Sequence, residues 1–465
     1  MTSSFGGRLS PVDTRQGLWY SRGVDGNFGK RSRRSTLWSW LQPGLGIKRW
    51  IVLLVAGIFL AALGISLGAS AISGNRNFVG ATSLPVGLVV GALLFAGLAA
   101  SLMALFRLNR SLLSPYVRPG KPVVEVVARH RRLGRGPKIV AIGGGTGLST
   151  LLRGLKVHTG NLTAIVTMAD DGGSSGRLRK SLGLPPPGDL RSCLAALSDD
   201  EDLLTQLFQY RFLEGEELEG HSFGNLFIAA LSGVTGSFDR GLLEAARVLA
   251  IRGRVLPSTL ADVSLSADKT PTLEARAIRV QGESRIPKVP GQIRRVYLEP
   301  SDPPAYPEAI HALLNADMIV IGPGSLYTSV MPNLLVPDIA DAVRSSRAFR
   351  AYICNVATQP GETDSYDCEA HWTALAEHAG EGLVDMVVAN DCLEVALPEG
   401  VSLVVPPEQG LKDVPFYSAD LVDHGSAGRH HSEQLAEILI SLLEERTGPL
   451  EWPKVEHIER VGELN

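Results

Sequence analysis

The stretch KIVAIGGGTGLSTLLRGL, residues 138–155, decides the fold of this chain. Residues 138–142 form a short β-branched apolar run, which is typical of a buried parallel strand. The leucines of residues 148–155 recur at helical spacing, so a helix should follow the glycines directly. A strand that enters a helix through a glycine turn is typical of α/β domains with a parallel sheet. We therefore predict an α/β domain built on a mainly parallel sheet.

The same turn is a candidate phosphate site. Main-chain N–H groups unhindered by side chains, next to a helix N-terminus, can receive phosphate. No lysine follows the glycines, so the turn is not an ATP-binding loop of the GxxxxGK type, and it is not a complete GxGxxG motif. The alternative interpretation is a plain glycine turn. The candidate ligand-binding residues of this turn are Gly143, Gly144, Gly145, Thr146 and Gly147.

A second strand is predicted at residues 162–167, and the loop MADDGGSSG, residues 168–176, follows it. Parallel strands have their carboxyl ends at one edge of the sheet, so this loop should line the same crevice. Asp170 or Asp171 can bind a sugar hydroxyl, hold Mg²⁺ or act as a catalytic base. Adjacent side chains diverge, so the two carboxylates should not serve one ion equally. The alternative is a turn that binds its own backbone.

Five later segments add polar candidates at the same edge, one of them GHSFGNL (residues 220–226), in which His221 and Asn225 are four apart and could share a helix face. Asp189, in PPPGDLR (residues 185–191), is expected to cap the helix that follows it. A strand at residues 317–321 runs into a second glycine turn, and a strand at residues 351–356 leads to a polar loop at 358–363. Arg429 precedes an amphipathic helix and is a candidate phosphate partner, with a solvated flank as the alternative. The further candidate residues are Ser174, Asp189, His221, Asn225, Gly322, Gly324, Ser325 and Arg429.

Two uncharged apolar runs, residues 50–72 and 86–106, precede the domain. Each is long enough to cross a hydrocarbon core of roughly 30 Å as a helix. A signal peptide is a poor alternative because the first run begins about 50 residues into the chain, and a pair of buried core helices is the other alternative. Nine basic residues precede the first run and nine follow the second, up to residue 138. Positive flanks stay in the cytoplasm, so we expect a multi-pass plasma-membrane protein with both termini and the globular domain inside.

These patterns divide the chain into five parts. We expect a basic disordered segment at 1–48, a transmembrane hairpin at 49–106, a basic linker at 107–137, the α/β domain at 138–447 and a tail at 448–465.

Charge argues against nucleic-acid binding, and cysteine spacing argues against a cysteine-rich zinc site or a disulfide framework. Residues 1–138 carry 19 basic and three acidic side chains, whereas residues 139–465 carry 26 basic and 45 acidic ones, a net charge of −19. So acidic a domain should repel nucleic acid over most of its surface. The four cysteines lack the CxxC spacing of a zinc site or a disulfide framework.

Six motifs in order resemble the YvcK-type gluconeogenesis factors, which belong to the superfamily of CofD, the 2-phospho-L-lactate transferase. They lie at residues 143–147, 169–176, 185–191, 220–226, 322–330 and 358–364, and the resemblance covers roughly residues 137–447. It implies a Rossmann-like fold and a nucleotide-sugar ligand, typically UDP-N-acetylglucosamine. It also implies that Thr146, Asn333 and Arg429 contact this ligand. The membrane hairpin departs from the familiar soluble members.

The resemblance implies a role in cell shape and peptidoglycan precursor supply during gluconeogenic growth. We favour a regulator without catalysis, because no Ser-His-Asp order, metal-spaced histidine cluster or P-loop lysine is present. The alternative is a CofD-like transferase that acts on a nucleotide-activated phospho-acid, with Mg²⁺ held by Asp170 or Asp171. The expected partners are the nucleotide sugar, the membrane and cell-wall synthesis proteins; a homodimer is left open.

Overall fold

The computed structural model describes residues 48–72, 86–113, 132–198, 203–271, 276–426 and 428–448. The chain divides into two compact units, Met1–Glu125 and Val126–Asn465. The N-terminal segment before residue 48, the loop between the two apolar runs, most of the basic linker and the tail after residue 448 lie outside the described residues.

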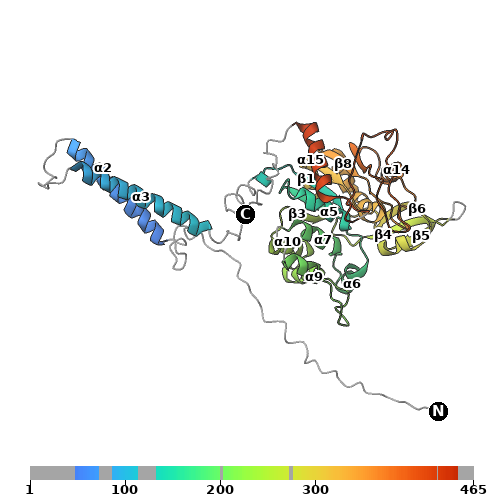
Figure 1. Cartoon of the computed structure of the whole chain (residues 1–465). Coiled ribbons are helices and arrows are strands. Elements are labelled where there is room, and N and C mark those ends of the chain that lie inside the picture. The colour runs from blue at the N-terminus through green and yellow to red at the C-terminus, as the bar shows by residue number, and fades with distance from the viewer. Residues whose placement is uncertain are drawn as a thin grey trace, which may run out of the picture. The chain divides into compact units, whose positions relative to one another are not determined.

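The first unit contains two long helices that lie side by side, α2 (Lys48–Ile72) and α3 (Val86–Leu113) (Figure 1). Both are long and apolar enough to cross a membrane. They approach closely at glycines, because a Cβ atom on Gly97 would lie 2.6 Å from the Ala61 nitrogen. The second helix continues seven residues beyond the predicted end at residue 106, since Pro115 is the first residue there that cannot continue a helix.

The second unit is built on a parallel sheet of seven strands, in the order β10-β9-β8-β7-β1-β2-β3. The strands are β1 (Ile139–Gly143), β2 (Leu162–Val166), β3 (Arg254–Pro257), β7 (Met318–Ile321), β8 (Phe349–Ile353), β9 (Met386–Asn390) and β10 (Phe416–Ala419). Every neighbouring pair is parallel, with Ile139 paired to both Leu162 and Met318. The predicted mainly parallel sheet is confirmed.

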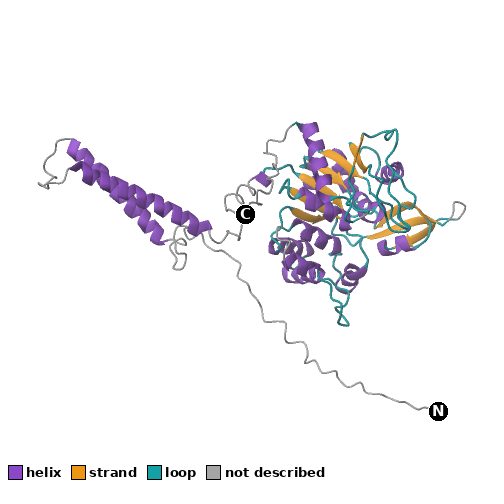
Figure 2. Cartoon of the chain, viewed as in Figure 1, coloured by secondary structure: helices purple, strands orange, loops and turns teal. Residues whose placement is uncertain are grey.

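Helices cover both faces of this sheet, which explains why β1, β2 and β7 are buried along their whole length (Figure 2). One group contains α5 (Gly145–Leu155), α6 (Gly173–Leu182), α7 (Gly188–Leu197), α8 (Leu203–Gln209), α9 (Phe223–Thr235), α10 (Phe238–Val248) and α15 (Ser432–Thr447). The other contains α11 (Pro307–Leu314), the π-helical turn η4 (Leu326–Val330), α12 (Met331–Leu334), α13 (Pro337–Ser345) and α14 (Cys368–Ala379). Right-handed crossovers in opposite directions from β1 place the two groups on opposite faces.

Two further features position the site. The C-terminal helix α15 packs on α5, where the Ser432 hydroxyl donates to the Thr150 carbonyl at 2.7 Å. An antiparallel sheet of β5 (Ile278–Gln281), β4 (Ser264–Thr270) and β6 (Gln292–Glu299) is inserted between β3 and β7, with the 3₁₀ helix η3 (Glu283–Lys288) between its strands.

The chain order creates one special point in the parallel sheet. From β1 the chain moves outward through β2 and β3, then returns to the other side of β1 at β7 and continues to β10. The crossovers leave β1 and β7 in opposite directions, so a crevice opens at the carboxyl ends of these two strands.

Candidate functional site

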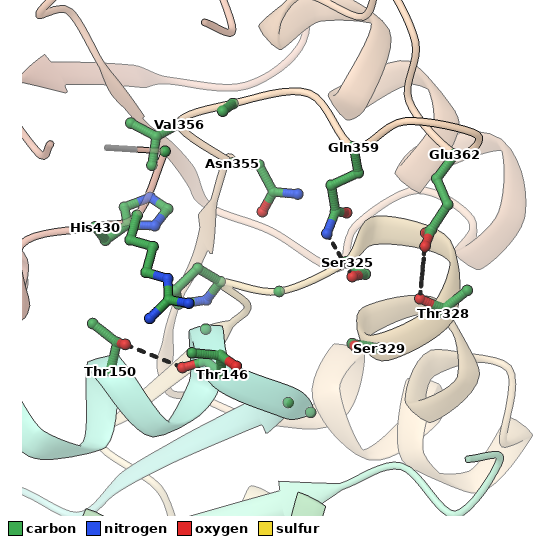
Figure 3. Close-up of a pocket in the computed structure, with 18 of the residues that line it drawn as sticks. Thr146, Thr150, Ser325, Thr328, Ser329, Asn355, Val356, Gln359, Glu362 and His430 are labelled. Carbon is green, nitrogen blue, oxygen red and sulfur yellow. Dashed lines mark hydrogen bonds between the residues drawn. The ribbon is translucent and has the colours of Figure 1, made fainter. Parts of the chain in front are cut away.

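A cavity of about 570 Å³ lies at the carboxyl ends of β1 and β7, where the direction of the crossovers reverses; we call this place the switch point. Both glycine turns, the polar loop after β8 and two loops after β9 and β10 enclose it, and Figure 3 shows side chains from several of these segments around it. The described lining residues are Gly144, Gly145, Thr146, Gly147, Thr150, Thr167, Asp170, Asp189, Glu283, Pro323, Gly324, Ser325, Thr328, Ser329, Asn355, Val356, Ala357, Thr358, Gln359, Glu362, Leu397, Pro398, Val401, Gly428, Arg429 and His430.

The first glycine turn opens α5 directly onto the cavity. Gly145 has φ +61°, a left-handed conformation that favours glycine. The N-cap residue of α5 is Gly144, which has no side chain to cap the helix. The positive end of the helix therefore faces the cavity. Thr146 is exposed there, and its carbonyl accepts a hydrogen bond from the Thr150 hydroxyl at 3.1 Å (Figure 3).

The prediction that Asp189 caps its own helix is wrong. Pro187 stands at the N-cap of α7 and no side chain bonds there. The Asp189 carboxylate instead accepts from the Gly145 amide at the start of α5. Local sequence placed Asp189 in a capping position, but the neighbouring glycine turn offers an N–H group that is also unsatisfied.

The second glycine turn, after β7, lies against the first. Gly147 packs so closely on it that a Cβ atom would stand 2.6 Å from the Pro323 oxygen. Ser325 reaches the cavity, and its hydroxyl oxygen accepts from the Gln359 amide at 2.6 Å (Figure 3). Gly324 also lines the cavity, whereas Gly322 lies behind it.

Asn333 ties the two turns together from behind. Its side chain is fully buried, and its Nδ2 donates to the Gly143 carbonyl at 3.0 Å and to the Ser329 carbonyl at 2.8 Å. Neither Asn333 nor Gly143 lines the cavity. A direct contact of Asn333 with a ligand stays a prediction.

Four carboxyl groups face the cavity: Asp170, Asp189, Glu283 and Glu362. Burial is the largest cause that raises the pKa of each group, to about 6 for Asp189, about 8 for Glu283 and about 7 for Glu362. Like charges add to the effect, because Asp170 raises the pKa of both Asp189 and Glu283. Carboxylate oxygens suit a hard divalent cation, which would lower these pKa values again. Among the described residues, no three of these four groups have ligand atoms within 4.8 Å of one another, so an ion here would use one or two of them.

The two adjacent aspartates diverge, as predicted. Asp170 lines the cavity, and its Oδ1 accepts from the Gly172 amide at 2.8 Å. Asp171 points elsewhere, and its Oδ1 accepts from the Ser284 amide at 2.9 Å. Asp171 thereby fixes the turn that carries Glu283 into the cavity. Asp170 remains the better metal candidate of the pair.

A buried lysine holds two of the acidic segments in place. Lys269 of β4 is fully buried, and its Nζ donates to the Ile286 carbonyl at 2.9 Å and to the Gly361 carbonyl at 2.7 Å. These carbonyls belong to the segments that present Glu283 and Glu362. The Glu362 carboxylate in turn accepts from the Thr328 hydroxyl at 3.1 Å (Figure 3).

Ser174, His221 and Asn225 come together, but outside the lining. The Ser174 hydroxyl lies 2.9 Å from His221 Nδ1 and accepts from Asn225 Nδ2 at 3.0 Å. All three side chains are buried and join α6 to the start of α9. In this structure they support the fold near the cavity, and a ligand contact for them stays a prediction.

Arg429 and His430 enter the cavity from the loop before α15. The Arg429 side chain is exposed, and its guanidinium makes no hydrogen bond or ion pair with a described residue. Burial lowers the pKa of His430 to about 4, so the ring is neutral near pH 7 and its Nε2–H donates to the Cys354 carbonyl at 3.1 Å. Arg429 is thus the permanent cation among the described lining residues.

Sequence patterns missed some of the lining. Glu283 follows a strand of the antiparallel sheet, with no motif around it, and tertiary folding alone brings it to the cavity. Leu397, Pro398 and Val401 were missed for the same reason. The polar loop with Thr358, Gln359 and Glu362 was expected at this rim because it follows a strand end.

The chain was compared with known proteins. Residues 139–399 match the family described as 2-phospho-L-lactate transferase CofD. The gluconeogenesis factor of Bacillus subtilis is 45% identical over 328 residues, which cover 67% of this chain and 100% of that protein. A relative from Deinococcus radiodurans is 40% identical over 435 residues, 89% of this chain and 90% of the relative. The matched 89% of this chain is longer than the second unit, so the match extends into the part before Val126.

A solved structure agrees with these matches. The crystal structure of a UPF0052 family member from Bacillus halodurans is 45% identical, covers 66% of this chain and 99% of that chain, and superimposes with a TM-score of 0.61. The sequence identity, the coverage and the shared parallel sheet all agree, and the chain belongs to the gluconeogenesis factor family of CofD-like proteins.

Proposed function

We propose that this chain is a membrane-anchored regulator that binds a nucleotide sugar, with UDP-N-acetylglucosamine as the first candidate. The observation that carries the proposal is the cavity at the switch point, where the glycine-rich start of α5 and the free guanidinium of Arg429 face the same space. A helix N-terminus and an arginine together suit a diphosphate. The volume of about 570 Å³ falls within the range of small-molecule sites.

A divalent cation fits beside this diphosphate. The four carboxyl groups of the cavity would repel an anionic ligand if all were ionised. A Mg²⁺ ion between these groups and the phosphates would remove the repulsion. Asp170 and Asp189 are the oxygen ligands we assign to it, since both line the cavity and the charge of Asp170 acts on Asp189.

The names of the relatives support only a proposal for the biological role. Its relatives carry the name gluconeogenesis factor, and we propose for this chain a role in cell shape and cell-wall precursor supply during gluconeogenic growth. The helices α2 and α3, with basic residues on both flanks, would hold the domain at the cytoplasmic side of the plasma membrane, near cell-wall synthesis proteins. Deletion of residues 1–125 should then move the protein from the membrane fraction to the soluble fraction.

Titration calorimetry of the full chain in detergent micelles tests the ligand. UDP-N-acetylglucosamine should bind saturably, and more tightly with Mg²⁺ than with a chelator. Arg429→Ala should weaken binding by about 1.5–3 kcal/mol, the range for a hydrogen bond to a charged group. Arg240→Ala, an exposed position on α10, is the matched control and should bind normally. Equal affinity in both variants would reject the assignment of Arg429, and no heat with any sugar nucleotide would reject the ligand class.

A second candidate function is a CofD-like transferase. The acidic cavity favours it, because carboxylates with raised pKa values can hold Mg²⁺ and accept a proton from an acceptor hydroxyl. Chromatography of the same incubation separates the two functions. Intact sugar nucleotide after long incubation supports the regulator, whereas release of UMP or UDP supports the transferase.

A further inference from the structure

One wall of the cavity consists of two loops that follow neighbouring strands. β9 and β10 pair in parallel and end together at Asn390 and Ala419. The loop after β9 contributes Leu397, Pro398 and Val401 to the lining, and the loop after β10 contributes Gly428, Arg429 and His430. The two loops approach each other at their far ends, where a Cβ atom on Gly428 would lie 3.5 Å from Leu397 Cδ2.

At their near ends, these loops bring together three side chains of the kinds that bind transition metals. Cys392 comes from the first loop, and Asp420 and His424 come from the second. One ligand atom from each residue lies within 4.8 Å of the others, and His424 Nε2 stands 3.2 Å from Asp420 Oδ2. The cluster lies outside the cavity lining and takes no part in the function proposed above.

The spacing fits a tetrahedral zinc ion. Zn–N and Zn–O bonds of about 2.05 Å require roughly 3.3 Å between two ligand atoms of a tetrahedron, close to the observed separation of the imidazole and carboxylate. A surface ion pair at positions i and i+4 would explain Asp420 and His424, but not the thiol beside them. Thiolate and carboxylate together also balance the charge of a divalent ion.

The bases of both loops are already fixed by one residue. Asn390 is buried, and its Oδ1 accepts from the Cys392 amide at 3.3 Å and from the Leu421 amide at 3.1 Å. Its Nδ2 donates to the Cys392 carbonyl at 2.7 Å. Cys392 and the residue next to Asp420 are thus held on one side chain, which restricts their separation before any metal arrives.

We propose that Cys392, Asp420 and His424 bind a thiophilic divalent metal, with Zn²⁺ as the first candidate, and that this ion joins the two loops of the cavity wall. The fourth position would be taken by water. The ion would restrict the second loop, which carries Arg429. The proposal stands apart from the identity of the cavity ligand.

The cysteine content makes the test specific. Cys193, Cys354 and Cys368 are fully buried in the hydrophobic core, and the chain contains four cysteines in all. A metal that shows thiolate ligation in the folded protein must therefore use Cys392.

The test is a cobalt titration. It uses the reduced, metal-free full chain in detergent micelles, without a histidine tag. We expect one equivalent of Co²⁺ to give thiolate-to-cobalt charge-transfer absorption and the intense visible bands of tetrahedral cobalt, both abolished by excess Zn²⁺. Cys392→Ser should remove the charge-transfer band. His424→Ala should weaken Co²⁺ binding about tenfold or more. His311→Ala, an exposed histidine far from the cluster in sequence, should behave as wild type.

Two results would overturn the proposal. One is the absence of charge-transfer absorption with wild type, and the other is its persistence in Cys392→Ser. The link to the cavity wall has its own measurement, hydrogen exchange across residues 420–430. Zn²⁺ should slow exchange of the Asp423 and Arg429 amides, which bond to the Arg429 and Ser426 carbonyls. Bound Zn²⁺ without slower exchange there would refute the link between the loops.

Discussion

Replacing Gly147 with alanine tests whether the contact between the two glycine turns sets the geometry of the cavity. The new Cβ atom would stand 2.6 Å from the Pro323 oxygen, 2.8 Å from the Pro323 carbonyl carbon and 3.0 Å from the Gly324 Cα atom. All three are main-chain atoms, so no side-chain rotation relieves the clash. The turns must separate by about 0.8 Å to reach an ordinary contact distance.

The expected change in the free energy of unfolding is the difference between the cost of overpacking and the gain in helix preference. Overpacking of this kind costs about 1–3 kcal/mol, and the upper part of the range applies because main-chain atoms must move. Alanine in a helix is favoured over glycine by about 1 kcal/mol. The net effect is a loss of about 2 kcal/mol, which for a domain of this size lowers Tm by roughly 4 °C. Ligand binding should weaken as well, because the start of α5 is displaced from the cavity.

Gly233→Ala is the matched control. Gly233 lies in helix α9, and a Cβ atom there would meet nothing within 4 Å. The helix preference acts alone at this position, so Tm should rise by roughly 2 °C. Differential scanning calorimetry of both variants in the same detergent measures the two shifts. A Gly147→Ala protein that melts at or above the wild-type temperature and binds its ligand normally would refute the close approach of the two turns.

Three more outcomes are expected. The free energy of unfolding of the metal-free protein should fall as pH rises from about 5 to 8, because burial raises the pKa of Glu283 to about 8 and the folded state then holds the proton more tightly. Glu283→Gln should flatten this dependence in urea titrations, and an unchanged slope would contradict the assignment. Lys269→Met removes the donor to the buried Ile286 carbonyl and to the half-buried Gly361 carbonyl, and should cost about 2 kcal/mol in urea unfolding. Lys180→Met, at an exposed position of α6, should cost nothing measurable, and equal stability of the two variants would exclude the proposed role of Lys269. Asn333→Ala should lower the free energy of unfolding by about 1–3 kcal/mol, because the buried hydrogen bonds from its amide to the Gly143 and Ser329 carbonyls are lost. Wild-type stability would show that Asn333 is not the tie between the turns.

The parts of the fold that sequence predicted are those fixed by local patterns. The apolar runs that became β1, β2, β7 and β8 are buried strands because helices cover both faces of the sheet, and such strands need no alternation of polar and apolar residues. The rule that ligands bind at strand carboxyl ends then placed Thr146, Asp170 and Ser325 at one cavity. No contact had to be known in advance for these inferences.

Sequence reasoning failed where a side chain selects a partner from a distant segment. Asp189 bonds to Gly145 rather than to its own helix, and the Asn333 amide donates to the Gly143 carbonyl, a bond that no local pattern indicated; its predicted ligand contact stays a prediction. Both choices depend on which main-chain groups tertiary folding leaves unsatisfied. Glu283 reaches the cavity only because β4, β5 and β6 form a sheet of their own, and local periodicity contains no information about that pairing.

The packing of α15 on α5 has a consequence for the order in which the protein is made. The segment that supplies Arg429 and the helix that follows it are synthesised long after α5, yet both complete a wall against elements near the start of the domain. A nascent chain released before residue 432 would retain most of the parallel sheet but lack part of this enclosure. Translation must therefore pass residue 447 before this wall is complete, and a chain that terminates earlier would leave the cavity open on that side.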